Sequence, residues 1–298
     1  MSTHPTIGAR NITVGYGDRE ILHDISVELP EGEFTVIVGP NACGKSTLLK
    51  ALCRMLPPTR GEVQLDGVNI HKQPPKEVAK KLSLLPQSPI APDDITVYDL
   101  VSRGRYPHQS AFQHWSAADE EAVQRALLQA RVVELADRRV SELSGGQRQR
   151  VWIALVLAQD TPIVFLDEPT TYLDITHQVE VLNLARALQR SGRTVVAVLH
   201  ELTLAFRYAT HLIMMKDGRI VAEGAVEDVV TSELLKEVYA LDCDIVPDPR
   251  TGRPIVIPRD DEDWTLPGTA TPETAAVAAP VADAADTVDT MVFDAVRD

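Results

Sequence analysis

Residues 39–47 read Gly39-Pro40-Asn41-Ala42-Cys43-Gly44-Lys45-Ser46-Thr47, and they follow the apolar run Phe34-Thr35-Val36-Ile37-Val38. This stretch fits the pattern G-x-x-x-x-G-K-[ST], which predicts a strand, a glycine-rich loop and then a helix. Backbone N–H groups of such a loop point inward and the helix offers its positive end, so the segment forms a cradle for phosphate groups. We expect Lys45 to pair with the β- and γ-phosphates of a nucleotide, and Ser46 to give its hydroxyl to Mg²⁺.

The size and composition of the chain fit a soluble protein with a substantial core. Its 298 residues suffice for one large domain or two small ones. No apolar run approaches the ~18 residues of a membrane span and no charged-then-apolar leader opens the chain, so we expect a cytoplasmic protein. The cysteines, Cys43, Cys53 and Cys243, suit free thiols in a reducing compartment. At Cys43 a small side chain that fits the loop is favoured over an oxidation-sensitive switch.

The charge of the chain is strongly negative, at −14. Nucleic-acid binding depends on many Lys and Arg side chains, so this charge argues against a nucleic-acid partner. Much of the acidity lies in residues 259–298, a tail rich in alanine, proline and threonine. We expect that tail to be disordered, because it cannot bury enough apolar area to offset the entropy lost on ordering. Within it, residues 291–296 are a candidate for a short partner-binding helix.

Alternating runs separated by turn residues predict three hairpins, at residues 7–16 with 21–29, 63–65 with 68–70, and 211–215 with 219–222. Tyr16 ends the first run. It either stacks on an adenine ring or packs in the hairpin core, and the phosphate loop nearby favours stacking.

Helical patterns follow the phosphate loop and dominate the middle of the chain. We expect a first helix at residues 47–56, ended by Pro57-Pro58, and an amphipathic helix at 119–136. The region from about 88 to 150 thus reads as a helical insertion in a parallel α/β domain. A helix and then a small β appendage, at 241–258, are expected before the tail.

The insertion ends in Leu143-Ser144-Gly145-Gly146-Gln147. Ser144 and Gln147 form an S-x-x-Q capping box, which predicts the start of a helix. Two glycines in the first turn leave the backbone N–H groups unobstructed, so this helix start is a second candidate anion site.

Polar side chains follow three apolar strands. Asp167 and Glu168 close the run 163–166; we expect Asp167 to hold Mg²⁺ and Glu168 to orient, or take a proton from, the water that attacks the γ-phosphate. His200 follows the strand at 194–199 on the same edge, where an imidazole senses the γ-phosphate or is merely structural. Gln87 follows the strand at 82–85. Its amide can coordinate a metal and accept a hydrogen bond from water, but Gln87 is equally well explained as an ordinary polar loop residue.

Taken in order, these motifs resemble the nucleotide-binding subunit of an ABC transporter, and the likeness spans about Thr6 to Pro258. It implies an α/β fold: a P-loop NTPase (RecA-like) core with an antiparallel β subdomain and an inserted helical subdomain, as one ATPase domain over residues 1–258. The likeness assigns ATP and Mg²⁺ as cofactors. It matches Tyr16 to the adenine-stacking aromatic, Gly39 to Thr47 to the Walker A loop, Gln87 to the Q-loop, Leu143 to Gln147 to the signature, Ile163 to Glu168 to Walker B, Leu173-Asp174 to the D-loop and His200 to the switch histidine.

Finer sequence features narrow the resemblance to one group of ABC transporter ATPases. Residues 95–108, 168–174 and the appendage at 241–258 are similar to the ATPases of iron-siderophore importers, whose wider family includes haem and cobalamin uptake. Two positions depart from the family pattern. Ala42 stands where glycine is usual, which bears on loop flexibility, and Glu201 replaces the usual aspartate after the histidine.

The resemblance implies a subunit at the cytoplasmic face of the membrane. Two copies, expected to be identical, meet head to tail, so that the signature of one closes over the nucleotide of the other. A separate membrane permease and, indirectly, a substrate-binding protein are the implied partners. The rival interpretations are a soluble ABC ATPase outside transport, a P-loop kinase and a non-catalytic regulatory module.

Overall fold

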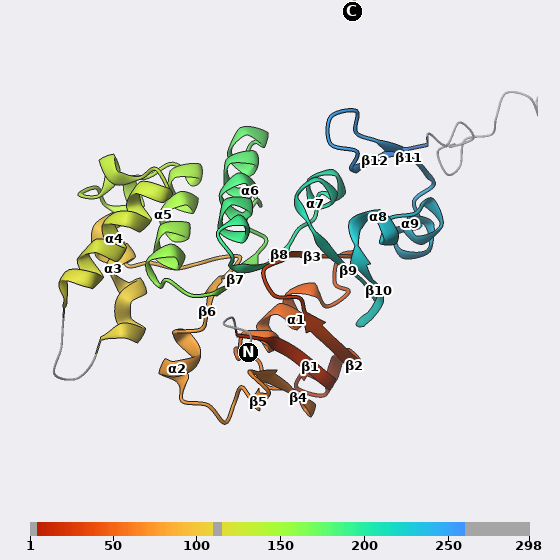
Figure 1. Ribbon diagram of the computed structural model, residues 1–298, viewed down its shortest axis with the longest axis horizontal. Helices are drawn as coiled ribbons and strands as arrows, with labels where there is room; N and C mark the ends of the chain where they lie inside the picture. The colour runs from red at the N-terminus through yellow and green to blue at the C-terminus, as the bar shows by residue number, and fades with distance from the viewer. Residues whose placement is uncertain (1–4, 110–114, 260–298) are drawn as a thin grey trace, which may run out of the picture. The chain divides into compact units, whose positions relative to one another are not determined.

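A six-stranded sheet forms the centre of the fold (Figure 1). The computed structural model describes residues 5–109 and 115–259; the candidate helix at 291–296 lies outside them. In spatial order the strands are β10 (Arg219–Ala225), β9 (His211–Lys216), β3 (Phe34–Val38), β8 (Thr194–Val198), β7 (Ile163–Asp167) and β6 (Leu82–Leu85). Neighbouring strands are parallel, except that β9 and β10 form a hairpin at one edge.

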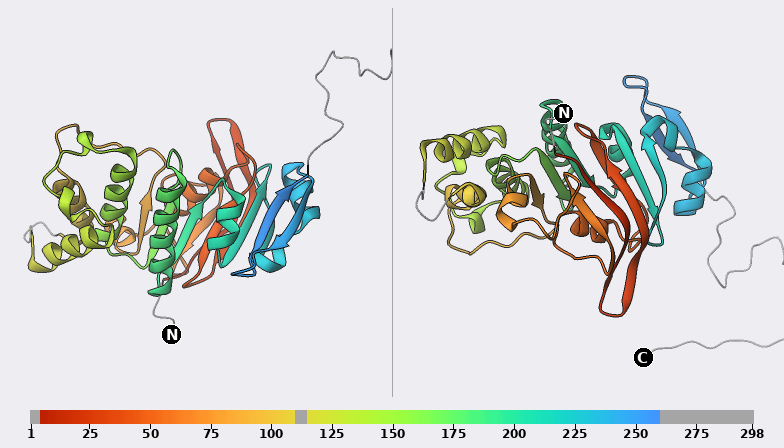
Figure 2. Two further views of the ribbon diagram at one scale, coloured as in Figure 1. Left: turned by 90° about the horizontal axis from the view of Figure 1, so that it is seen from above. Right: turned by 60° about the horizontal axis from the view of Figure 1, so that its bottom comes forward.

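A second, antiparallel sheet lies beside the first, as both views of Figure 2 show. Its order is β2 (Arg19–Leu29), β1 (Ile7–Tyr16), β4 (Arg60–Leu65) and β5 (Val68–Asn69), which contains the first two expected hairpins. Helix α1 (Lys45–Leu52) contacts strands of both sheets, namely β1, β2, β7 and β8. The phosphate loop that precedes α1 is therefore held between the two sheets.

The remaining helices pack against the parallel sheet or lie beyond one of its two edges (Figure 1). Between β6 and β7 lie α3 (Val97–Ser102), α4 (Ala117–Gln129), α5 (Gly145–Ala158) and the 3₁₀ turns η1 (Arg103–His108), η2 (Val133–Leu135) and η3 (Val140–Glu142). The others are α2 (Pro75–Ala79), α6 (Ile175–Arg190), α7 (Leu202–Tyr208), α8 (Val226–Val229) and α9 (Ser232–Tyr239), followed by a hairpin of β11 (Cys243–Pro247) and β12 (Pro254–Pro258). None of the helices in residues 5–109 and 115–259 is long and apolar enough to span a membrane.

Alternate side chains of the parallel strands enter two separate cores. On β3, Phe34, Val36 and Val38 pack in a core shared with α3 to α7, whereas Ile37 packs with α1 and the antiparallel sheet. Such continuous apolar runs are typical of parallel strands that are covered on both faces. The residues at the carboxyl ends of these strands are therefore carried by a sheet that is buried on both faces.

Two helix ends differ from the sequence predictions. Helix α1 ends at Leu52 rather than at residue 56, and α4 ends at Gln129 rather than at 136. Each is followed by an arginine in the left-handed region, Arg54 at φ 65° and Arg131 at φ 55°. The backbone hydrogen bonds of a Schellman motif, at 2.9–3.1 Å, then close both helices. Glycine usually occupies this position, so the arginines gave no stop signal.

Candidate functional site

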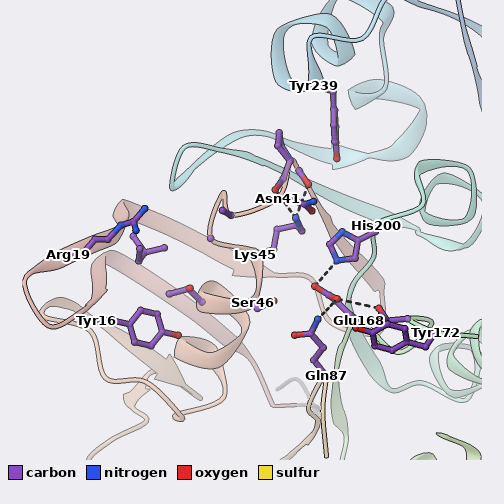
Figure 3. A pocket seen from close by; sticks show the side chains of 17 residues that line it. Tyr16, Arg19, Asn41, Lys45, Ser46, Gln87, Glu168, Tyr172, His200 and Tyr239 are labelled. Carbon is purple, nitrogen blue, oxygen red and sulfur yellow. Dashed lines mark hydrogen bonds and ion pairs between the residues drawn. The ribbon is translucent and has the colours of Figure 1, made fainter. Parts of the chain in front are cut away.

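The carboxyl ends of the parallel strands meet at one cavity of about 1090 Å³ (Figure 3). Every residue of the loop 39–47 except Cys43 lines it. Gln87 follows β6, Glu168 follows β7 and His200 follows β8, and all three face this cavity together with Tyr16. Ligand sites of open α/β sheets lie at this edge. The structure thus brings most of the predicted site residues into one place.

The phosphate loop is held closed on itself by its own lysine. Lys45 is buried, and its Nζ donates to the carbonyl oxygens of Gly39 and Pro40, each at 2.8 Å. Gly39 has φ 153°, and a Cβ there would lie 2.3 Å from the carbonyl oxygen of Met215 on β9. Ala42, the departure from the family pattern, has φ 62°, a left-handed conformation that glycine adopts without steric cost. The backbone at Ala42 therefore has the left-handed conformation typical of glycine, although the residue carries a methyl group.

Cys43 is the one loop residue that does not line the cavity. Its side chain is buried, and burial raises the pKa of its thiol. A buried thiol with a raised pKa is a poor nucleophile. The structure therefore favours the interpretation of Cys43 as a small side chain that fits the loop.

Glu168 is the centre of a hydrogen-bond network at the end of β7. Its Oε2 accepts from Gln87 Nε2 at 2.5 Å and from the hydroxyl of Thr171 at 3.2 Å. Its Oε1 lies 2.6 Å from His200 Nε2 (Figure 3). Glu168 also has φ 51°, a left-handed backbone that costs about 1–3 kcal/mol in a residue with a side chain. Both the strained backbone and the three contacts fix the direction of this carboxylate.

Asp167 lies beneath the cavity, with only 2% of its surface exposed. Burial raises the pKa of its carboxyl group, and a hydrogen bond with Ser46 and the charge of Lys50 oppose that rise. Its Oδ1 is buried without a hydrogen-bond partner among the described residues. Asp167 therefore carries an unpaired acceptor beside the hydroxyl of Ser46.

Two tyrosines line the cavity from opposite sides. Tyr16 is half exposed at the end of β1, as a stacking residue would be. Opposite it, Tyr239 points from the end of α9 toward the loop (Figure 3). Burial raises the pKa of the Tyr239 phenol, and a hydrogen bond with the backbone of Gly39 partly offsets this rise.

The second candidate anion site lies elsewhere. Ser144 Oγ accepts from the Gln147 N–H at 3.3 Å and Gln147 Oε1 accepts from the Ser144 N–H at 3.1 Å, so the predicted capping box is present. Neither these residues nor Gly145 and Gly146 line the cavity. Asp174, also outside it, caps α6 by accepting from the His177 N–H at 2.9 Å. One copy of the chain thus presents two separate helix starts that are candidates for binding phosphate.

Five lining residues were missed from the sequence: Arg19, Ile21, Thr171, Tyr172 and Tyr239. Thr171 and Tyr172 lie only a few residues after Glu168, and their closeness to the acidic pair was a usable signal. Nothing local marks Tyr239, because it enters the cavity through the packing of α9.

A family model described as ABC transporter matches residues 22–171. This chain is 51% identical over 253 residues to the probable siderophore transport system ATP-binding protein YusV of Bacillus subtilis (strain 168), covering 85% of this chain and 92% of the relative. The chain belongs to the ABC transporter family. The ferric enterobactin transport ATP-binding protein FepC of Escherichia coli (strain K12) is 52% identical to this cassette over 248 residues. The match covers 83% of this cassette and 92% of that relative.

Solved structures agree with this membership. The dimeric structure of MJ0796, a bacterial ABC transporter cassette, is 30% identical and matches with a TM-score of 0.66 over 74% of this cassette and 98% of that chain. A post-hydrolysis dimer of the same protein, bound to ADP and Pi, matches with a TM-score of 0.65 at 28% identity over the same shares. The P-loop fold predicted from the sequence is confirmed, and so is the prediction of an ATPase. The kinase interpretation is wrong, because the chain belongs to the ABC transporter family.

Proposed function

We propose that this cassette is the ATP-hydrolysing subunit of an importer for a ferric siderophore or a related iron complex. The identity of about half its residues to two siderophore-transport ATP-binding proteins, over nearly their whole length, carries the proposal. Its partners would be a separate membrane permease, a second copy of the cassette and, indirectly, a substrate-binding protein. It would work at the cytoplasmic face of the membrane, with residues 1–258 as one ATPase domain.

The geometry of the cavity supports a reaction in which the cassette's own residues rearrange. Lys45, now bound to the carbonyls of Gly39 and Pro40, exchanges those partners for the β- and γ-phosphates of ATP. Glu168 then releases Gln87 and orients, or accepts a proton from, the attacking water. His200, which contacts Glu168 in this structure and lines the same cavity, would then turn toward the γ-phosphate.

The signature completes the site from a second copy. Because Ser144 to Gln147 do not line the cavity of their own chain, a nucleotide bound there reaches them only in another protomer. A head-to-tail pair places the start of α5 from one copy on the triphosphate held by the other. ATP then joins the two copies, and loss of the γ-phosphate releases them.

The residues around Asp167 fit a Mg²⁺ ion that accompanies ATP. The unpaired, buried Oδ1 of Asp167 and the hydroxyl of Ser46 are oxygen donors of the kind that Mg²⁺ prefers, and the Gln87 carbonyl oxygen is a third candidate. A Mg²⁺ ion held there would supply positive charge that offsets the negative charge of the phosphates.

Replacing Asp167 by Asn tests this site through stability. We expect the Tm of the nucleotide-free protein to rise by about 2–4 °C, because the change removes a buried charge whose Oδ1 has no hydrogen-bond partner, at a gain of about 1 kcal/mol, and an amide keeps the hydrogen bond with Ser46. The variant should also lose the extra stabilisation that MgCl₂ gives to the ATP-bound protein. Thermal melts with and without MgCl₂ measure both effects, and Asp137→Asn, an exposed carboxylate, serves as the control. A Tm below that of the wild type would contradict the assignment.

The transport function is tested by deleting the gene and measuring growth on defined iron sources. We expect growth on one class of ferric siderophore to be lost and growth on freely soluble iron to be retained. If growth on haem or another metal chelate, or growth that depends on cobalamin, is lost instead, the transported compound is that one and not a ferric siderophore. Purification of the tagged cassette should yield an integral-membrane permease; recovery with ribosomes or DNA would point to a soluble ABC ATPase and overturn transport.

A further inference from the structure

A histidine outside the cavity packs against the start of α5. A Cβ built on Gly146 would lie 2.5 Å from Cδ2 and 2.9 Å from Nε2 of His177, and its three nearest atoms all belong to that imidazole. A Cβ built on the neighbouring Gly145 would meet nothing within 4 Å. One side of this helix start is therefore filled by His177, and the side of Gly145 is open.

The imidazole of His177 is itself held in place. Its Nδ1 lies 2.8 Å from Oδ1 of Asp174, the residue that caps α6. The hydrogen bonds that Asp174 accepts from the backbone and the ring of His177 lower the pKa of the Asp174 carboxyl group. With Nδ1–H donating to this carboxylate, the ring is fixed at the start of α6 and its Nε2 side faces Gly146.

Further along, two hydrogen bonds join α5 to the same segment of the chain. Gln149 Nε2 donates to the carbonyl of Pro169 at 2.9 Å, and Arg150 pairs with Glu180 at 3.0 Å. These contacts begin one turn into the helix. They hold the body of α5, whereas His177 contacts its first turn, where the N–H groups of the signature lie.

We propose that His177 is a positioning residue for the signature. Its imidazole, anchored on Asp174, supports the backbone of Gly146, so that the N–H groups at the start of α5 reach the triphosphate of the other copy in the correct place. This inference rests on the proposed head-to-tail pair. Without the ring, the first turn of α5 has a gap behind it, and small misplacements of binding groups cost large factors in function.

The main test measures ATP-dependent dimerisation in a hydrolysis-blocked Glu168→Gln parent. We expect His177→Ala to raise the ATP concentration for half-maximal dimerisation about tenfold. The affinity of the monomer for a fluorescent ATP analogue should be unchanged, because the cavity is intact. In the unblocked enzyme the same change should raise KM for ATP more than it lowers kcat. His108→Ala, an exposed histidine of η1, is the control.

Two further variants separate packing against Gly146 from the side-chain hydrogen bond to Asp174. His177→Phe keeps a ring against Gly146 and should restore most of the dimerisation. His177→Asn keeps a donor for Asp174 without a ring and should behave like His177→Ala. Unchanged dimerisation of His177→Ala, or rescue by Asn and not by Phe, overturns the inference. A Glu168→Gln parent that stays monomeric beside its permease contradicts the proposed pair instead.

A measurement of stability tests the contact without any dimer. Alanine is ordinarily favoured over glycine in a helix, so Gly145→Ala should leave Tm unchanged or raise it slightly in every background. Gly146→Ala should lower Tm by about 2–4 °C in the wild type, since the new methyl group meets the imidazole. In a His177→Ala background it should no longer do so. An equal loss in both backgrounds refutes the packing on which the inference depends.

Discussion

Replacing Glu168 by Gln reduces steady-state ATP hydrolysis by at least about 100-fold, because an amide cannot take a proton from the attacking water. The amide has the shape of the carboxylate and still accepts a hydrogen bond from Gln87, so the fold and ATP binding are retained. A phosphate-release assay gives the rate, and equilibrium ATP binding checks that the cavity is intact.

The same Glu168→Gln variant should accumulate as an ATP-bound dimer, since the nucleotide that joins the two copies is no longer cleaved. Size-exclusion chromatography with and without ATP detects this state. Glu134→Gln, an exposed carboxylate of η2, controls for loss of one negative charge and should leave the rate unchanged. Near-normal hydrolysis by the Glu168 variant would show that another residue activates the water.

Replacing Asp119 by Asn lowers the free energy of unfolding by about 3–5 kcal/mol at pH 7, because it leaves a buried charge without its partner. Arg105 and Asp119 are 7% and 5% exposed, and Arg105 Nε donates to Asp119 Oδ1 at 2.9 Å. Arg105 also donates to the carbonyl of Ala158, the last residue of α5, at 2.8 Å. The pair thus joins η1, α4 and α5, and urea denaturation measures its loss.

The effect of Asp119→Asn should depend on pH. Burial raises the pKa of Asp119, but hydrogen bonds from Ser116 and Arg105 outweigh it, so the pKa lies below its usual value. A lowered folded-state pKa contributes stability above the unfolded-state value near 3.8, and the contribution is lost as pH falls through the folded-state value. The difference in the free energy of unfolding between wild type and variant should therefore have its full size at pH 7 and shrink below about pH 4.

An exposed pair on the same helix is the matched control for Asp119. Glu121 and Arg125 are largely exposed and 3.5 Å apart, so Glu121→Gln should change stability by less than about 0.5 kcal/mol. If the free energy of unfolding of Asp119→Asn stays within about 1 kcal/mol of the wild-type value at pH 7, burial does not make this pair important for stability.

The sequence by itself determined the parts of this protein that depend on a few neighbouring residues. The loop 39–47, the capping box of Ser144 and Gln147 and the acidic pair at the end of β7 are each set by local backbone chemistry. Their order along the chain was enough to predict the fold and the ATPase family. Residues 259–298 were expected to be disordered; all but Arg259 lie outside the described residues, and that expectation stays a prediction.

Tertiary structure decided which groups touch. Gln87 reaches Glu168 across 81 positions of sequence, and Tyr239 reaches the loop from α9. The contact of His177 with Gly146 likewise joins two helix starts that no short pattern relates. Such contacts depend on how distant elements pack against one sheet, and local patterns carry no information about packing between distant segments. The two early helix ends were missed for another reason, because arginine, and not the usual glycine, takes the left-handed position that closes each helix.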